Sequence, residues 1–163
     1  MLKRLGTFIG ALAAMSCGGA NSTPATPTPT PTQASITLTG SPNPATAKVC
    51  SAPTGDDYPF YVTITGTLTV QETAGIGGNL DMISIGGTGS TPVAFHRGSA
   101  GRVGANGSLR FPFGWESGLA DPNASRSYVL LIYVAMTDDR GNHVSANMTL
   151  PSVTDNVLLE CRR

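Results

Sequence analysis

Residues 60–71 read FYVTITGTLTVQ, and apolar and polar side chains alternate along the stretch. One face carries Phe60, Val62, Ile64, Gly66, Leu68 and Val70, and the other carries Tyr61, Thr63, Thr65, Thr67, Thr69 and Gln71. Because successive side chains of a β-strand point to opposite faces, this pattern predicts a strand with one buried face and one face in water. Gly66 lies in the middle of the apolar face, which favours a bend or a bulge there.

Other stretches with strand character lie on both sides of this segment, separated by residues that favour turns. They cover residues 35–39, 80–85, 92–96, 109–115, 128–137, 143–150 and 156–161. The stretch 128–137 is apolar on both faces, which is typical of a central strand, and Pro92 favours an edge position for the strand that it begins. Seven or eight short strands at this spacing, without a helical segment inside the domain, predict an all-β fold, a two-sheet antiparallel sandwich.

The strand pattern over 34–163 is similar to that of the immunoglobulin-like domains of bacterial surface proteins. The resemblance holds at the level of the fold and implies one immunoglobulin-like β-sandwich domain over these residues. The chain departs from antibody domains, because Trp115 lies far along the sequence from both Cys50 and Cys161. A domain of this length buries roughly two thirds of its unfolded surface, which is enough for a core without help from a disulfide.

The N-terminal residues have the layout of an export signal. Lys3 and Arg4 precede an uncharged and mostly apolar stretch over 5–15. That length suits the apolar region of a signal peptide, whereas a helix that spans a bilayer needs about 20 residues. We therefore predict a signal peptide over 1–16.

Cys17 directly follows this signal. Residues 14–17, AMSC, resemble the lipobox of bacterial lipoproteins, with small residues before the cysteine and Gly18 after it. The resemblance implies a lipid on Cys17 that anchors the chain in a membrane, and the absence of aspartate at position 18 resembles the outer-membrane sorting pattern. The alternative is cleavage by ordinary signal peptidase and free secretion.

A low-complexity stretch separates the signal from the domain. Residues 23–32 read TPATPTPTPT, and each proline fixes its own φ and favours extended geometry in the residue before it. We expect residues 17–33 to form a disordered, extended linker whose Thr-Pro part spans roughly 30 Å. The alternative, a proline-rich ligand for an aromatic groove, lacks the flanking charge that such ligands often carry.

The three cysteines are unevenly placed. If Cys17 carries the lipid, Cys50 and Cys161 remain as a natural pair in an oxidising compartment. A disulfide between them would close nearly the whole domain and contribute roughly 4 kcal/mol in the chain-entropy picture. The alternative is two buried thiols.

Charge and composition exclude some function classes. Without residues 1–16 the chain has eight basic and ten acidic residues, and no basic run is present. A nucleic-acid partner is therefore not expected. Charged residues make up 12% of the chain, which suits an exported β-protein better than a helical enzyme.

The sequence offers no clear metal or cofactor site. His96 and His143 lack further ligands at metal-binding spacing, and we expect both to be exposed residues at strand ends. The acidic pairs Asp56–Asp57 and Asp138–Asp139 suit turns, because Asp and Asn favour turn geometry. Weak Ca²⁺ binding by the turn 138–142 is the alternative.

Catalytic motifs are also missing. No Gly-x-Ser-x-Gly sequence is present, and no glycine-rich loop follows a strand and opens a helix. Glu72, Glu116 and Glu160 are the only carboxylates that we consider for sugar cleavage, if the fold brings two of them together. We predict a protein that is not an enzyme.

The stretch from His96 to Gly107 is the most plausible recognition surface, because it is predicted as a long glycine-rich loop with Arg97 and Arg102. A plain hairpin connection is the simpler interpretation. Trp115, with Phe111 and Phe113 before it, is a candidate sugar-stacking platform, although core packing is favoured by its alternation with polar residues. The tentative ligand surface thus comprises Arg97, Arg102 and Trp115.

Together these patterns predict a lipid-anchored cell-envelope protein of the bacterial outer membrane or cell surface. Its domain would have a structural, adhesive or ligand-binding role, with an envelope protein or a glycan as partner. The first alternative is a carbohydrate-binding module of a secreted or surface-attached system that uses Trp115. A hydrolase ranks third.

Overall fold

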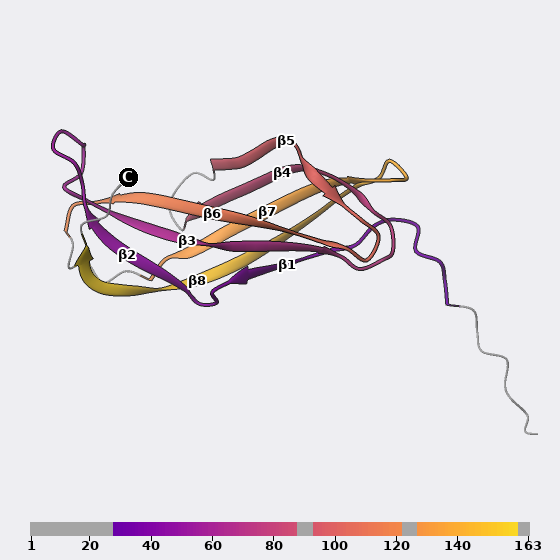
Figure 1. Cartoon of the computed structure of the whole chain (residues 1–163), viewed down its shortest axis with the longest axis horizontal. Helices are drawn as coiled ribbons and strands as arrows, with labels where there is room; N and C mark the ends of the chain where they lie inside the picture. Colours follow the sequence, from indigo (N-terminus) through magenta and orange to yellow (C-terminus); the bar gives the residue numbers. More distant parts are fainter. Residues whose placement is uncertain (1–27, 88–92, 122–126, 160–163) are drawn as a thin grey trace, which may run out of the picture.

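The computed structural model describes residues 28–87, 93–121 and 127–159. The eight strands are β1 (Ile36–Ser41), β2 (Ala45–Ser51), β3 (Phe60–Glu72), β4 (Gly78–Gly87), β5 (Val93–Val103), β6 (Ser108–Leu119), β7 (Val129–Asp138) and β8 (His143–Leu159). Figure 1 shows these strands and no helix among the described residues. The predicted all-β fold is therefore confirmed. The described part of the chain accordingly contains no helix capable of crossing a membrane.

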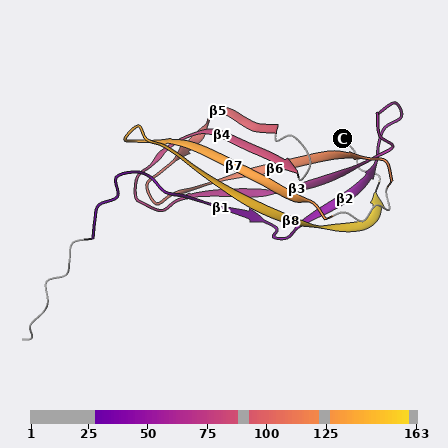
Figure 2. The same cartoon turned by 180° about the vertical axis from the view of Figure 1, so that it is seen from behind.

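The strands form one curled mixed sheet, as Figures 1 and 2 show from opposite sides. Its order is β1-β3-β2-β8-β7-β4-β5, and β6 pairs with β3 outside this path. β1 and β2 follow one another along one edge of β3, while β6 runs along the other edge. β2 and β8 run parallel, whereas the other described pairs are antiparallel. The prediction of a purely antiparallel arrangement is therefore wrong for this pair.

The predicted strand at 60–71 is confirmed as β3, and its apolar face lies in the core. The fully buried apolar side chains of β3 are Val62, Ile64, Leu68 and Val70. Gly66 causes no bulge, because the register with β6 continues through the Gly66–Phe113 pair. A Cβ at Gly66 would lie 2.8 Å from the Phe113 ring and 2.9 Å from the Ser41 carbonyl oxygen. Glycine is therefore needed for close packing at this position. It lies between the part of β3 that pairs with β2 and the part that pairs with β1.

β2 is a strand that the sequence analysis missed. Ala45, Ala47 and Val49 are buried and alternate with exposed Thr46 and Lys48. Because alanine is small and only weakly hydrophobic, the alternation of apolar and polar side chains is hard to detect in this stretch of sequence. Cys50 consequently lies within a strand, outside the stretches that were predicted as strands.

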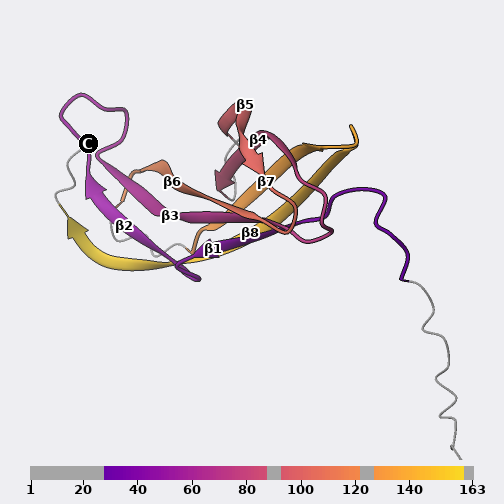
Figure 3. The same ribbon diagram turned by 45° about the vertical axis from the view of Figure 1, so that its right-hand side comes forward.

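β8 is one strand of 17 residues, where two separate strands were predicted. Pro151 lies between the two predicted stretches, but it pairs with Val129 at the beginning of β7. The next backbone N–H, from Ser152, donates to the Tyr128 carbonyl oxygen at 2.8 Å. Beyond this point β8 curves away from β7 and pairs with β2 (Figure 3).

The predicted loop from His96 to Gly107 is also wrong. β5 continues to Val103 as an edge strand on β4, and only a tight turn over 104–107 follows it. Glycines interrupt the side-chain alternation, but the backbone still pairs with β4 through register shifts between Leu80 and Met82 and between Ile83 and Ser84.

β7 lies between β4 and β8, as expected for a central strand. Its inward side chains Leu130, Ile132 and Val134 are buried. The other apolar face is not covered, since Leu131 is 48% and Tyr133 is 38% exposed. The predicted central position is therefore confirmed, although one apolar face of the strand is exposed.

Candidate functional site

The turn between β7 and β8 holds the N-terminal arm of the domain. The buried Asp138 carboxylate accepts hydrogen bonds from the backbone N–H groups of Ala34 at 2.9 Å, Arg140 at 2.9 Å and Asn142 at 2.8 Å. Burial alone would raise the pKa of Asp138, but the hydrogen bonds from Ala34 and Asn142 outweigh it and lower the pKa to about 2. Asp138 is therefore an ionised acceptor for the backbone.

Two further contacts reach back into the predicted linker. Arg140 Nη1 donates to the Pro31 carbonyl oxygen at 2.7 Å, and Asn142 Nδ2 donates to that of Thr32 at 3.3 Å. We call Asp138, Arg140 and Asn142 the arm clamp. It fixes the last linker residues against one end of the domain.

Glu72 organises the same end from the interior. Its fully buried carboxylate accepts backbone N–H groups of Ser35, Ala74, Gly75, Ile76 and Asn106, at 2.7 to 3.3 Å. Burial opposes ionisation, yet the pKa of Glu72 is lowered, because the hydrogen bonds from Asn106, Ala74 and the others favour the charged form. Glu72 thus joins the arm to the turns after β3 and β5.

Glu72 and Glu116, the two described carboxylates considered for sugar cleavage, do not come together. Glu116 pairs with Thr63 near the start of β3, whereas Glu72 is the last residue of that strand. Nine residues of one strand separate these positions, which corresponds to about 30 Å. Glu160 lies outside the described residues. The pair Glu72–Glu116 therefore cannot act on one glycosidic bond.

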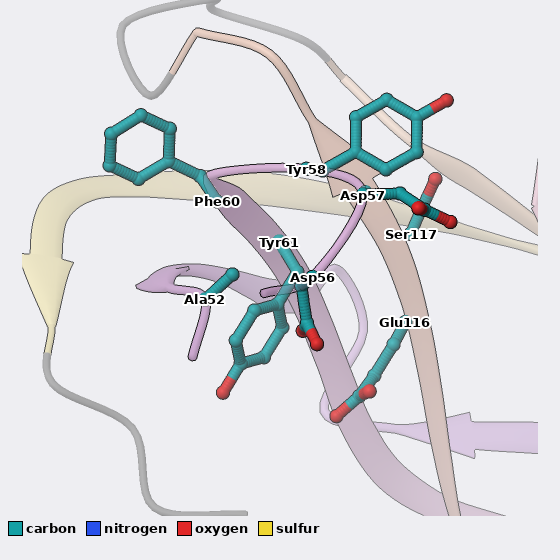
Figure 4. A pocket seen from close by; sticks show the side chains of 9 residues that line it. Ala52, Asp56, Asp57, Tyr58, Phe60, Tyr61, Glu116 and Ser117 are labelled. Carbon is teal, nitrogen blue, oxygen red and sulfur yellow. The ribbon is translucent and has the colours of Figure 1, made fainter. Parts of the chain in front are cut away.

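A cleft lies at the end of the domain opposite the arm clamp. Its volume is about 260 Å³, and it lies between the β2–β3 loop and β6 (Figure 4). The lining residues are Ala52, Asp56, Asp57, Tyr58, Phe60, Tyr61, Glu116, Ser117 and Gly118. The loop is closed at its base by a hydrogen bond of 2.9 Å from the Ala52 N–H to the Pro59 carbonyl oxygen.

The cleft combines carboxylates with aromatic rings. Asp56 and Asp57 come from the loop and Glu116 from β6, and all three are exposed. Tyr58 is 53% exposed and packs over Gly118, where a Cβ would overlap the ring. In the sequence, Asp56 and Asp57 lie about 60 positions before Glu116. Only the β3–β6 pairing brings the loop next to Glu116.

The tentative ligand surface of Arg97, Arg102 and Trp115 is not one surface. Trp115 is 8% exposed, and its ring centroid lies 5.6 Å from that of Tyr128. Phe111 is also buried, so the preferred interpretation of these aromatic residues as core is confirmed. Trp115 offers no exposed ring for stacking, which removes the basis of the carbohydrate module proposed there.

Arg102 lies near the arm clamp. Its Nη1 and Nη2 atoms contact the Asp139 carboxylate at 2.7 and 2.6 Å. This hydrogen-bonded pair raises the pKa of Arg102 and lowers that of Asp139, and both side chains are exposed. Arg97 has its Cα paired with that of Met82 on β4, and its side chain lies outside the described part.

The structure describes some of the remaining histidine and cysteine residues, and others lie outside the described part. His143 is exposed at the start of β8, as expected, and its Nδ1 lies 3.0 Å from Thr137 Oγ1. In the described residues, no group of three or more His, Cys, Asp or Glu side chains is arranged for a metal ion. Cys50 is fully buried. Cys17 and Cys161 lie outside the described residues, so lipidation and the disulfide stay predictions.

Comparison with known proteins leaves the family open. No protein-family model and no curated protein matches the chain. Among solved structures, it is similar to a chain described as "X-ray structure of Northeast Structural Genomics Consortium target SoR45". The two share 13% identity with a TM-score of 0.48, over 80% of this chain and 94% of the other. A likeness at this level carries no argument about fold family or function.

Proposed function

We propose that the protein is a non-enzymatic, lipid-anchored cell-envelope protein that presents a ligand-binding end away from its membrane. One observation carries the proposal: the arm clamp and the cleft lie at opposite ends of the domain. The β7–β8 turn, which carries the clamp, and the β2–β3 loop, which lines the cleft, are far apart in Figure 1. β3 connects these ends, and its 13 residues correspond to about 40 Å. A chain anchored through Cys17 would therefore hold the cleft at a distance from the bilayer.

The fixed arm supports a role for the linker as a stalk. Because Pro31, Thr32 and Ala34 are hydrogen-bonded to the β7–β8 turn, the domain has a defined direction relative to the last linker residues. A stalk that is merely a loose connection needs no such contacts. The Thr-Pro part before them would add roughly 30 Å of extended chain.

The proposed fold is an immunoglobulin-like sandwich. Its first sheet would contain β1, β3 and β6, and its second sheet would contain β8, β7, β4 and β5. β2 would link the two, because it pairs with β3 on one side and with β8 on the other. The parallel β2–β8 pair then explains why the strands form one continuous curled sheet.

The predicted disulfide is part of the proposal. In the parallel pair, the Cα of Cys50 is aligned with that of Leu159. Cys161 follows only two residues later, so the end of β8 leads toward Cys50. A bridge would fasten the end of β8 to β2, where no turn joins them.

Binding suits the described carboxylates better than catalysis. Asp138 and Glu72 have lowered pKa values because backbone N–H groups surround them, and both hold segments of the fold together. A general acid near neutral pH needs the opposite shift. The exposed acids of the cleft lie beside Tyr58, an arrangement that suits recognition of a ligand by charge and ring contact.

The experiment is an intact mass of the protein extracted with detergent from a bacterial host, before and after reduction and alkylation. We expect a chain that begins at Cys17 with an added diacylglyceryl-type mass, and two cysteines that are alkylated only after reduction. A Cys17→Ser variant is the control. It should lack the added lipid mass and should no longer be found in the membrane fraction. An unmodified wild-type chain in the soluble fraction would overturn the anchor.

A further inference from the structure

An apolar groove crosses the outer face of the sheet, separate from the cleft. Its volume is about 440 Å³. The groove is lined by Ser84 from β4, Leu131, Ile132 and Tyr133 from β7, and Asn147, Met148 and Thr149 from β8. It is therefore built on three adjacent strands in the middle of the fold, and not on a loop.

Two large apolar side chains are left in water on this face. Leu131 is 48% and Tyr133 is 38% exposed, although their neighbours Leu130 and Ile132 are buried in the core. The core is thus complete without them. Exposing a leucine and a tyrosine on the same face of one strand gives no stability to the fold, so these residues suggest a contact with something outside it.

The strand register surrounds the tyrosine with polar groups. Tyr133 is paired with Asn147 on β8 and with Ser84 on β4, and Leu131 is paired with Thr149. Paired residues of neighbouring strands share a face, with the strands about 4.8 Å apart. An exposed ring therefore lies between an amide on one side and a hydroxyl on the other.

Among the residues that the structure describes, no charged side chain lines the groove. Among the described side chains, Asp81 and His143 lie toward the arm clamp, where Thr137 Oγ1 donates to Asp81 at 2.7 Å and lies 3.0 Å from His143 Nδ1. Arg97 reaches the same face by register, through the Cα pairs Arg97–Met82 and Met82–Ala135, one row beyond Tyr133. A charged ligand would find no counter-charge in the groove and would lose its hydration. A neutral ligand with hydroxyl groups and an apolar face matches this chemistry.

We propose that the groove binds a neutral glycan. One apolar face of a sugar ring stacks on Tyr133, and the Asn147 amide and the Thr149 hydroxyl form hydrogen bonds with sugar hydroxyls. The proposal goes beyond the anchored role and the cleft, because it needs neither the lipid on Cys17 nor the loop around Tyr58. A second copy of the chain is the rival occupant. A stable interface buries about 800 Å² on each partner, which is far more than two exposed apolar side chains provide.

The test is affinity electrophoresis of the purified full chain in gels that contain hydroxyethylcellulose, glycogen, galactomannan or alginate. We expect at least one of the three neutral polysaccharides to retard the protein, and the anionic alginate to leave its mobility unchanged. Tyr133→Ala should weaken the retardation about tenfold or more, whereas Tyr133→Phe keeps the ring and should retain it. Val153→Ala is the matched control, since Val153 is an exposed apolar residue of β8 outside the groove.

Melting temperatures of all variants show whether each is folded. If Tyr133→Ala is not folded, Asn147→Ala replaces it, because it removes the proposed amide contact from the exposed side of β8 and should weaken the retardation. The proposal is overturned if none of the neutral polysaccharides retards the wild-type chain. Equal retardation of wild type and a folded Tyr133→Ala variant also overturns it. The proposal is likewise overturned if sedimentation shows that the wild-type chain is a dimer and that Tyr133→Ala is a monomer. That result would assign the face to contact with a second copy. Each result is independent of the mass measurement that tests the anchor.

Discussion

The Asp138 carboxylate accepts a hydrogen bond of 2.9 Å from the backbone N–H of Ala34, which lies 104 residues earlier in the chain. This contact connects the first residue of the domain to the turn between β7 and β8. Because Asn142 and Arg140 donate to the other carboxylate oxygen, one side chain orders both the turn and the arm. The direction in which the domain stands on its linker therefore depends on Asp138.

Replacing Asp138 by asparagine should release the arm. One of the two oxygen acceptors becomes an NH₂ group, which faces an N–H donor and cannot satisfy it. We expect a melting temperature lower by several degrees and faster proteolysis between residues 28 and 35. Asp139→Asn is the matched control, because it removes only an exposed pair with Arg102 and should change little. Similar protease sensitivity in both variants would count against the clamp.

Glu72→Gln should destabilise the domain by about 3 kcal/mol, because a fully buried acceptor of several N–H groups becomes in part a donor. Urea unfolding measures this free energy. Glu116→Gln is the control, since Glu116 is exposed and its loss should cost less than about 0.5 kcal/mol. An equal effect of the two substitutions would show that the Glu72 network is not a structural element.

The stability of the domain should fall in acid. Asp138 and Glu72 have pKa values below their unfolded values of 3.8 and 4.5, so their contribution is complete above that range. It is lost as pH falls through the folded values, which for Asp138 is about 2. Melting temperatures between pH 7 and pH 2 should therefore decline mainly below about pH 4.5. In Asp138→Asn the decline should be shallower, and an unchanged slope would argue against this origin.

Gly87→Ala should disturb the packing of Trp115. A Cβ at Gly87 would overlap the indole ring, so either the ring or β4 must move. We expect a loss of about 1 to 3 kcal/mol and a shifted tryptophan emission. Gly104→Ala is the matched control, because nothing lies within 4 Å of the position that its Cβ would take. Equal stability of both variants would mean that the indole is not tightly held.

Part of the candidate site was accessible from the sequence. Asp56, Asp57 and Glu116 were considered as acids, and Trp115 was assigned to the core by its alternation with polar neighbours. The groove at Tyr133 was hidden, because a stretch that is apolar on both faces looks the same whether one face is covered or not. Glu72 was considered for catalysis, whereas it has a structural role. The sequence does not show this role, because the N–H groups that donate to Glu72 come from three segments that are separate in the chain.

The sequence by itself determined the all-β class and the strands with clear alternation, because side-chain alternation with a period of two is a local property that a single stretch such as 60–71 displays. It also determined that β7 is central. It did not show β2 or the second half of β5, where small residues weaken the alternation. Tertiary structure decided the rest: the parallel pairing of β2 with β8, the single strand over 143–159, and the partners of Asp138 and Glu72. These depend on contacts between residues up to about a hundred positions apart, which no local pattern specifies. A strand with one apolar face needs other strands to bury that face, and its own sequence does not specify which ones. The packing of the whole core decides which strands pair with it.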